Sequence, residues 1–323
     1  MYHDAIRRLQ SLPVLPIPLA PTPIEELVRL NDEFRPHAES RLLIKRDDAI
    51  PFGFGGNKVR KLRLVAAPAI AAGADTLITT GGIQSNHARA TASIAARMGL
   101  GCVLVANGAP QQTPTANALL DRLLGAEVRH VERRDDRAPA MERAADELRA
   151  RGKRPFVIPL GASTPLGAAA FALAIGELLA QMPPPDLIVT STSSGGTQAG
   201  LVAGCLLHGI PTRVLGVSAD DPSASIAATI RGILAGLEDL LEARGLCADA
   251  RIEVDDRFVG GGYGAPTPAS TEAIELAARR EAIFLDPTYT AKAMAGLIAR
   301  LRAGDAAGTV LFWHTGGQVG LFS

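Results

Sequence analysis

The feature that most constrains the fold is a regular alternation of short β-branched runs with alanine-rich, helix-forming stretches. In the first part of the chain we expect strands at residues 76–80, 102–106, 127–131 and 156–159, and helices at 86–98, 115–124 and 139–151. Strands that recur about every 25 residues, each followed by a helix, are typical of right-handed βαβ units and a parallel sheet. The sequence therefore predicts an α/β fold with parallel sheets and flanking helices.

A second series of the same kind begins after residue 162. Strands are expected at residues 186–190, 213–218 and 309–313, with a helix at 198–208. The break between the two series predicts two α/β lobes with a cleft between them, which the length of 323 residues allows. Ligands of open α/β sheets bind at the carboxyl ends of the strands, so the loops at those ends are the first candidates for function.

Charge and composition argue against several classes of protein. The 33 basic residues balance the 33 acidic residues, so no basic field is expected that would hold nucleic acid or an anionic membrane. The longest apolar run, residues 64–72, is too short to cross a bilayer, which takes about 20 residues. Three distant cysteines without a C-x-x-C motif favour free thiols in a reducing compartment. We therefore predict a cytoplasmic enzyme with a small-molecule substrate.

A metal site is not predicted. The histidines form no H-E-x-x-H motif and have no cysteine companions. The carboxylate pairs at residues 47–48 and 255–256 are interpreted as solvated loop residues rather than as cation ligands.

The glycine-rich loop 53–56 precedes Lys58. The spacing is not that of a Walker loop, because the G-x-x-x-x-G pattern before the lysine and the Ser or Thr after it are missing. Glycines let the backbone approach a planar ligand, and a lysine held there can form an imine with an aldehyde. The alternative interpretation is a simple glycine-rich turn with a solvated lysine.

Two further turns are candidate anion sites, because each joins a strand to a helix. The turn 81–87 places Ser and Asn at a helix start, where free N–H groups can bind a carboxylate or phosphate, although simple capping is the alternative. The turn 191–200 combines small residues with hydroxyls and exposes several N–H groups, which favours a phosphate. Tyr263 and Tyr289 lie in loops and could either pack as rings or move protons.

An imine-forming lysine, a phosphate cup and a carboxylate site together suggest pyridoxal phosphate (PLP) acting on an amino acid. Residues 55–62, 82–87 and 195–200 resemble the 1-aminocyclopropane-1-carboxylate (ACC) deaminase and D-cysteine desulfhydrase family. Residues 286–297 and 314–317 extend the resemblance towards the C-terminus.

The resemblance implies PLP fold type II, the two-domain fold of the tryptophan synthase β subunit. It implies a larger PLP-binding domain formed by residues 1–47 and 162–323, and a smaller α/β domain formed by residues 48–161. It also implies a homodimer.

The resemblance further implies roles for individual residues. Lys58 would bind PLP as an imine and shuttle the substrate α-proton, and Ser85 would bind the substrate carboxylate. Tyr289 and Tyr263 would line the substrate side and complete the catalytic set. PLP would be held by Lys58, Asn86, Ser194, Gly195, Gly196, Thr197 and Thr315. The substrate would be bound by Ser85, Asn86, His87, Ser163 and Tyr289.

Two positions separate the branches of the family. ACC deaminases carry Glu and Leu where this chain has Thr290 and Thr315, which are the residues of D-cysteine desulfhydrases. A carboxylate against the pyridine nitrogen makes the ring a stronger electron sink, whereas a hydroxyl does not stabilise the protonated form. The resemblance therefore implies a carbon–sulfur lyase of the D-cysteine desulfhydrase branch, which would release pyruvate, ammonia and sulfide by α,β-elimination.

Other substrates and functions stay open. Residues 161–164 and 318–320 depart from the pattern usual in these desulfhydrases, and residues 52–54 are bulky, so all three segments are predicted as altered pocket walls. L-cysteate, D-serine, β-chloroalanine and ACC are the alternative substrates, because pocket contacts change affinity by only a few kcal/mol. β-Replacement, racemisation and a catalytically weak PLP-binding protein are the alternative functions.

Overall fold

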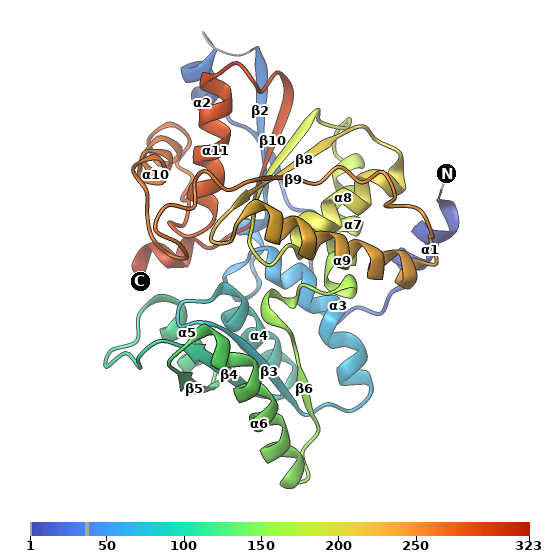
Figure 1. Cartoon of the computed structure of the whole chain (residues 1–323), viewed down its shortest axis with the longest axis vertical. Coiled ribbons are helices and arrows are strands. Elements are labelled where there is room, and N and C mark those ends of the chain that lie inside the picture. The colour runs from blue at the N-terminus through green and yellow to red at the C-terminus, as the bar shows by residue number, and fades with distance from the viewer. Residues whose placement is uncertain (1, 36–38) are drawn as a thin grey trace.

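The computed structural model describes residues 2–35 and 39–323, so the residues outside these ranges in the predicted domain 1–47 lie beyond the description. Within these ranges the strands form one six-stranded and one four-stranded sheet, and helices cover both (Figure 1). The larger sheet lies in the upper part of Figure 1 and the smaller sheet in the lower part. The predicted α/β class with parallel sheets and flanking helices is confirmed.

The six-stranded sheet brings the two ends of the chain together. Its order is β1 (Ile24–Glu26), β2 (Ser40–Arg46), β10 (Gly308–His314), β7 (Leu187–Thr192), β8 (Arg213–Ser218) and β9 (Glu253–Asp255). Only β1 is antiparallel to its neighbour among these described strands. The central strand β7 is buried along its whole length, which explains its continuous run of apolar and hydroxyl residues.

Helices cover both faces of this sheet. They are α1 (His3–Ser11), α2 (Val28–Phe34), α7 (Pro165–Leu179), α8 (Gly196–His208), α9 (Ser223–Leu241), α10 (Pro268–Glu281) and α11 (Thr290–Arg302). One apolar core lies between the sheet and α7, α8 and α9, and a second lies against α2, α10 and α11. Helices α7 and α8 pack very closely, since a Cβ at Gly200 would lie 2.1 Å from the carbonyl oxygen of Ala168.

The four-stranded sheet is parallel throughout and has the order β5 (Glu127–Val131), β4 (Gly101–Asn107), β3 (Thr76–Gly82) and β6 (Pro155–Val157). It packs with α3 (Asn57–Ala71), α4 (Asn86–Met98), α5 (Ala116–Leu123) and α6 (Arg137–Ala150). Short 3₁₀ turns at residues 47–49, 52–54, 134–136, 160–162 and 318–322 complete the described elements.

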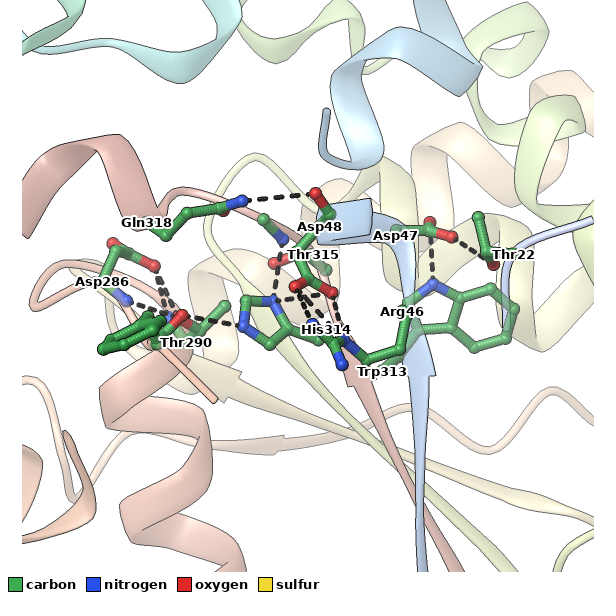
Figure 2. A network of polar contacts seen from close by, with 12 residues as sticks. Thr22, Arg46, Asp47, Asp48, Asp286, Thr290, Trp313, His314, Thr315 and Gln318 are labelled. Carbon is green, nitrogen blue, oxygen red and sulfur yellow. Dashed lines mark hydrogen bonds and ion pairs between the residues drawn. The ribbon is translucent and has the colours of Figure 1, made fainter. Parts of the chain in front are cut away.

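A buried network of charged side chains joins β2, α3, α7 and β10. Asp47, at the end of β2, accepts hydrogen bonds from Arg60 Nε of α3 (2.9 Å) and from Trp313 Nε1 of β10 (2.9 Å; Figure 2). Arg60 also pairs with Glu177 of α7 (2.8 Å), which accepts from Lys45 as well (2.6 Å). Asp47 is fully buried, so its prediction as a solvated loop carboxylate is wrong.

In the second carboxylate pair, the prediction of a solvated side chain is wrong for Asp255. Asp255 is buried and pairs with Arg257 (2.6 Å), and Asp256 accepts a hydrogen bond from the N–H of Ser223 at the start of α9 (2.7 Å). Asp255 is therefore not a solvated loop carboxylate, although its cationic partner Arg257 lies only two residues away in the sequence.

Candidate active site

A cavity of about 150 Å³ lies at the carboxyl ends of strands from both sheets and at the starts of α3, α4 and α8. This is the edge at which open parallel sheets bind ligands. Among the residues predicted from the sequence, those that line it are Lys58, Ser85, Asn86, His87, Ser194, Gly195, Gly196, Thr197, Tyr263, Tyr289 and Thr315. Ser163 lies directly behind this lining, with its Oγ 2.7 Å from Ser194 Oγ.

Lys58 enters the cavity from the first turn of α3. The preceding loop packs against the end of β10, where a Cβ at Gly56 (φ +94°) would lie 2.8 Å from the carbonyl oxygen of Thr315. The N–H of Asn57 donates to that same oxygen (2.9 Å), which fixes the start of the helix. Burial lowers the pKa of Lys58 to about 8, so the amine has a far larger uncharged, nucleophilic fraction near neutral pH than a solvated lysine.

The start of α8 forms an anion cup. Gly195 has a φ of +75°, and no described side chain caps the helix, which leaves first-turn N–H groups available. Asn57 Nδ2 donates to Thr197 Oγ1 (2.9 Å) across the cavity floor. A Cβ at Gly196 would lie 2.7 Å from Ser163 Oγ, so a larger residue there would close the cup.

Lys61 lies beside this cup, although its role was not predicted. Its amine is fully buried and donates to Ser163 Oγ (3.0 Å) and to the carbonyl oxygen of Gly161 (3.2 Å). Burial, followed by the charge of Lys58, lowers its pKa well below the usual range, and no described carboxylate pairs with it. The K-x-x-K spacing was the available signal, because residues i and i+3 share one face of a helix.

The start of α4 faces the cavity from the smaller sheet. Ser85 Oγ caps the helix by accepting from the N–H of Ala88 (3.2 Å), so the capping interpretation is confirmed while the first N–H groups still face the cavity. Asn86 Oδ1 accepts from Asn117 Nδ2 (2.9 Å), which leaves the amide NH₂ of Asn86 as a donor for a ligand.

His87 is neutral in this setting. Burial lowers its pKa well below the usual range, with Lys58 and Lys61 acting in the same direction. Its Nε2 lies 2.8 Å from the hydroxyl of Thr79, which itself donates to the carbonyl oxygen of Ile158. The hydroxyl must therefore accept from Nε2–H, which assigns the proton to that nitrogen.

The two tyrosines meet on the cavity wall near the end of β3, where a Cβ at Gly82 would lie 3.4 Å from the ring of Tyr263. Their hydroxyls are 2.7 Å apart and their rings pack edge to face at 5.8 Å. Burial raises the pKa of Tyr289 well above 10, with further contributions from Tyr263, so its hydroxyl is a neutral donor over the physiological range.

The two branch-defining threonines have different surroundings. Thr315 lines the cavity, and its hydroxyl lies 2.9 Å from Ser191 Oγ. Thr290 points away, into a turn where its hydroxyl donates to Asp286 Oδ1 (2.7 Å; Figure 2). His314 lies between the two residues in this view and accepts the N–H of Gly316 at Nδ1 (3.1 Å).

The comparisons with known proteins agree with this geometry. The model of the pyridoxal-phosphate dependent enzyme family matches residues 17–316. The chain belongs to this family. It is 38% identical over 330 residues to D-cysteine desulfhydrase of Klebsiella pneumoniae strain 342, covering 99% of this chain and 98% of that protein. It is also 38% identical to D-cysteine desulfhydrase of Salmonella choleraesuis strain SC-B67, covering 98% of both.

A solved structure described as an ACC deaminase homologue superposes on this PLP-dependent enzyme with a TM-score of 0.92 at 33% identity, covering 100% and 97% of the two chains. The predicted family, fold type and cofactor are confirmed. The cavity itself fits PLP, since a buried lysine, an uncapped helix start and a second buried amine are all present.

The predicted pocket walls are partly wrong. Gly161 lines the cavity of this PLP-dependent enzyme, but residues 52–54 and 318–320 do not. Sequence reasoning missed a polar group on the wall, formed by Asn107, Arg134, Arg137 and Asp220. Asn107 ends β4, Arg134 lies in the 3₁₀ turn 134–136, Arg137 begins α6 and Asp220 follows β8, so they share no local motif and only the fold brings them together.

Two findings concern other classes of site. In the described part of the chain, no group of three or more His, Cys, Asp or Glu residues is placed to hold a metal ion. No helix in those same ranges is long and apolar enough to cross a membrane.

Proposed function

We propose that this enzyme is a lyase that carries out α,β-elimination on small β-substituted amino acids, with D-cysteine as the first candidate substrate. The observation that carries the proposal is the buried Lys58 amine, which shares one cavity with the helix starts of α4 and α8. The full-length similarity to D-cysteine desulfhydrases supports the choice of substrate. The products would be pyruvate, ammonia and sulfide.

The cofactor, when bound, supplies an electron sink for the substrate α-carbon. We propose that the cup formed by residues 194–197 and Lys61 holds its phosphate, and that the amide NH₂ of Asn86 holds its ring oxygen. Thr315 would hydrogen-bond the ring nitrogen, because its hydroxyl faces the cavity beside Ser191.

The remaining residues would act on the substrate. Ser85 and the N–H groups of Asn86 and His87 bind its carboxylate, since the start of α4 faces the cavity. Lys58 takes the α-proton, for which a pKa of about 8 is suitable. Tyr289, held neutral by burial, donates a hydrogen bond on the substrate side, and Tyr263 orients it across 2.7 Å.

ACC deamination is the less favoured reaction. Thr315 offers a hydroxyl to the ring nitrogen, and Thr290 is held by Asp286 away from the cavity. Without a carboxylate at the ring nitrogen the electron sink is weaker, which suits departure of a good leaving group better than opening of a cyclopropane. A protein that only bound PLP would not need the second helix start at Ser85.

The proposal includes the domain division and the cellular setting. Residues 1–47 and 162–323 would form the larger domain around the six-stranded sheet, and residues 48–161 the smaller domain around the four-stranded sheet. A homodimer is proposed from the family resemblance, and a cytoplasmic location from the three free cysteines. Size-exclusion chromatography with light scattering tests the dimer.

The test of the function is turnover by the PLP-loaded enzyme. D-cysteine, L-cysteine, L-cysteate, D-serine, β-chloroalanine and ACC are each supplied, and pyruvate, ammonia and sulfide are measured. We expect pyruvate and sulfide in equal amounts from D-cysteine, and none from Lys58→Ala. If no β-substituted amino acid yields pyruvate, the proposed function is wrong.

A further inference from the structure

Arg137 is a buried cation on the cavity wall that the proposed chemistry does not use. It is the first residue of α6, is 9% exposed and lines the cavity together with Asn107 at the end of β4. Its Nε donates to the carbonyl oxygen of Arg134 (3.0 Å), and its Nη1 lies 3.3 Å from Asn107 Oδ1. These two contacts fix the guanidinium but leave Nη2 without a protein partner among the described residues.

The charge of Arg137 is not matched by the carboxylates around it. Asp135 pairs with Arg133 (3.6 Å), and Asp136 accepts the N–H of Arg133 (3.2 Å). The two acidic residues after β8 are engaged by Arg134, at 3.6 Å from Asp220 and 3.4 Å from Asp221. Within the described ranges, Arg137 forms no salt bridge.

Asp220, the acidic side chain on the same wall, is already satisfied. It accepts from Ser193 Oγ (3.1 Å) and from the N–H of Asp221 (3.0 Å), and its side chain is only 4% exposed. A cationic substrate group would therefore find an occupied acceptor, whereas an anionic group would find the free donor of Arg137. A buried guanidinium with a free N–H edge is well suited to an oxyanion, which it can bind through two parallel hydrogen bonds.

The position of Arg137 suggests which part of a substrate it would contact. The start of α8 and Lys61 form the phosphate end of the cavity, and the start of α4 forms the proposed carboxylate end. Arg137 belongs to neither group. It lies near Tyr263 and Tyr289, and its charge lowers the pKa of Tyr263 against the larger, opposite effect of burial. The remaining part of a small amino acid is its β-substituent.

We infer that Arg137 binds the β-substituent of the substrate and that, among the β-substituted amino acids of the proposed function, the enzyme prefers those with an oxyanion leaving group over D-cysteine, the candidate that similarity to known proteins places first. The inference rests on the proposed function and names its substrate class, for which a sulfonate (cysteate) and a phosphate ester (O-phosphoserine) are the two representatives. With cysteate, the Cα–H and Cβ–S bonds break, and sulfite leaves with the electron pair of the Cβ–S bond. One water then hydrolyses the three-carbon remainder to pyruvate and ammonia, without any change in overall oxidation state.

The first experiment compares substrates in the PLP-loaded enzyme and its Arg137→Met variant. Both enantiomers of cysteate and of O-phosphoserine are compared with D-cysteine by kcat/KM. We expect an oxyanion substrate to exceed D-cysteine, and Arg137→Met to lower its kcat/KM roughly 10–100-fold, as for loss of a hydrogen bond to a charged group. The loss for D-cysteine should be smaller, because sulfur is a weaker hydrogen-bond acceptor than an oxyanion. Arg137→Lys should retain part of the preference.

The second experiment measures binding without turnover. Aspartate and asparagine differ in charge at one end, and their dissociation constants are measured by calorimetry with the PLP-loaded enzyme. We expect aspartate to bind more tightly than asparagine, and the difference to vanish in Arg137→Met. Arg133→Met is the matched control, because Arg133 is exposed, lies in the same segment and does not line the cavity. It should leave the aspartate preference intact.

The outcomes separate the two claims. If Arg137→Met slows all substrates equally, or if aspartate and asparagine bind alike, the role of Arg137 is structural and the inference is overturned while the lyase function stands. If no substrate yields pyruvate but aspartate is still preferred through Arg137, the proposed function fails while the anion site stands. Preferential binding of a cationic amino acid such as 2,3-diaminopropionate would also overturn the inference.

Discussion

The most informative single substitution is Lys61→Met, because it should act in opposite directions on the cofactor and on the apoprotein. The amine of Lys61 is fully buried beside the phosphate cup and has no described carboxylate partner. Removing one hydrogen bond to a charged group is worth about 1.5–3 kcal/mol, so PLP affinity should fall roughly 10–150-fold. Met has a similar shape and, unlike Lys61, does not have to give up a proton when the chain folds, so the apoprotein should be unchanged or up to about 1 kcal/mol more stable.

Two assays measure these effects. Apoprotein is titrated with PLP by absorbance to give the dissociation constant, and urea unfolding of the apoprotein gives the free energy of unfolding. Lys153→Met makes the same substitution at an exposed lysine and should change neither quantity. An affinity within about 3-fold of the original, or an apoprotein destabilised by more than about 2 kcal/mol, would refute the reasoning, since either shows that Lys61 is a structural residue.

Three other predictions follow from the pKa values and the network. The rate of PLP uptake by the apoprotein should rise with pH with a midpoint near about 8, where Lys58 loses its proton. Stopped-flow absorbance between about pH 6.5 and 9.5 measures this rate, and a much higher midpoint would show that the amine is solvated. Tyr289→Phe should lower kcat about 100-fold, the scale of a lost proton donor, and leave PLP affinity unchanged. Tyr263→Phe should lower kcat less, because Tyr263 only orients Tyr289. Equal effects of the two substitutions in steady-state kinetics would contradict these roles. Burial raises the pKa of Glu177, but bonds from Arg60 and Lys45 outweigh it and lower the pKa to about 2. Because folding depresses this pKa, the ionised Glu177 stabilises the fold at pH values above the unfolded pKa of about 4.5, and this stabilisation is lost as the pH falls towards 2. Glu177→Gln should therefore lower the free energy of unfolding by about 2 kcal/mol at pH 7. In urea titrations, the decline of this free energy below about pH 5 should be flatter in the variant.

The local periodicity of the chain was enough to place all four strands of the smaller sheet and the strands β7, β8 and β10 of the larger sheet, but only four of the described α-helices, namely α4, α5, α6 and α8. The helix 86–98 and the strands 127–131 and 213–218 have the predicted bounds, because each is set by a glycine, proline or capping residue next to a clear apolar pattern. The strand β2 was not predicted, although it pairs with β10 along seven positions. Its position depends on a partner far away in sequence, which no local pattern shows.

The candidate site likewise contains residues that a local motif predicts and residues that depend on partners far away in the sequence. Lys58, Ser85 and the cup at residues 194–197 were predictable because each lies at or next to the start of a helix and has its own short motif, and all of them line the cavity. Arg137 and Asp220 were not predicted, because their surroundings depend on partners from other segments: Asn107 in one case, Ser193 and Arg134 in the other. Buried charge without a motif becomes visible only when the fold shows which carboxylates are already paired.

The central claim is that Lys58 is the residue that binds the cofactor and does the chemistry. The most direct test is borohydride reduction of the PLP-loaded enzyme, followed by peptide mass spectrometry, with the visible spectrum recorded first. We predict an absorption band near roughly 410–420 nm and a reduced pyridoxyl label on Lys58, both absent from Lys58→Ala. A label on Lys61, or a labelled Lys58→Ala protein, would contradict it.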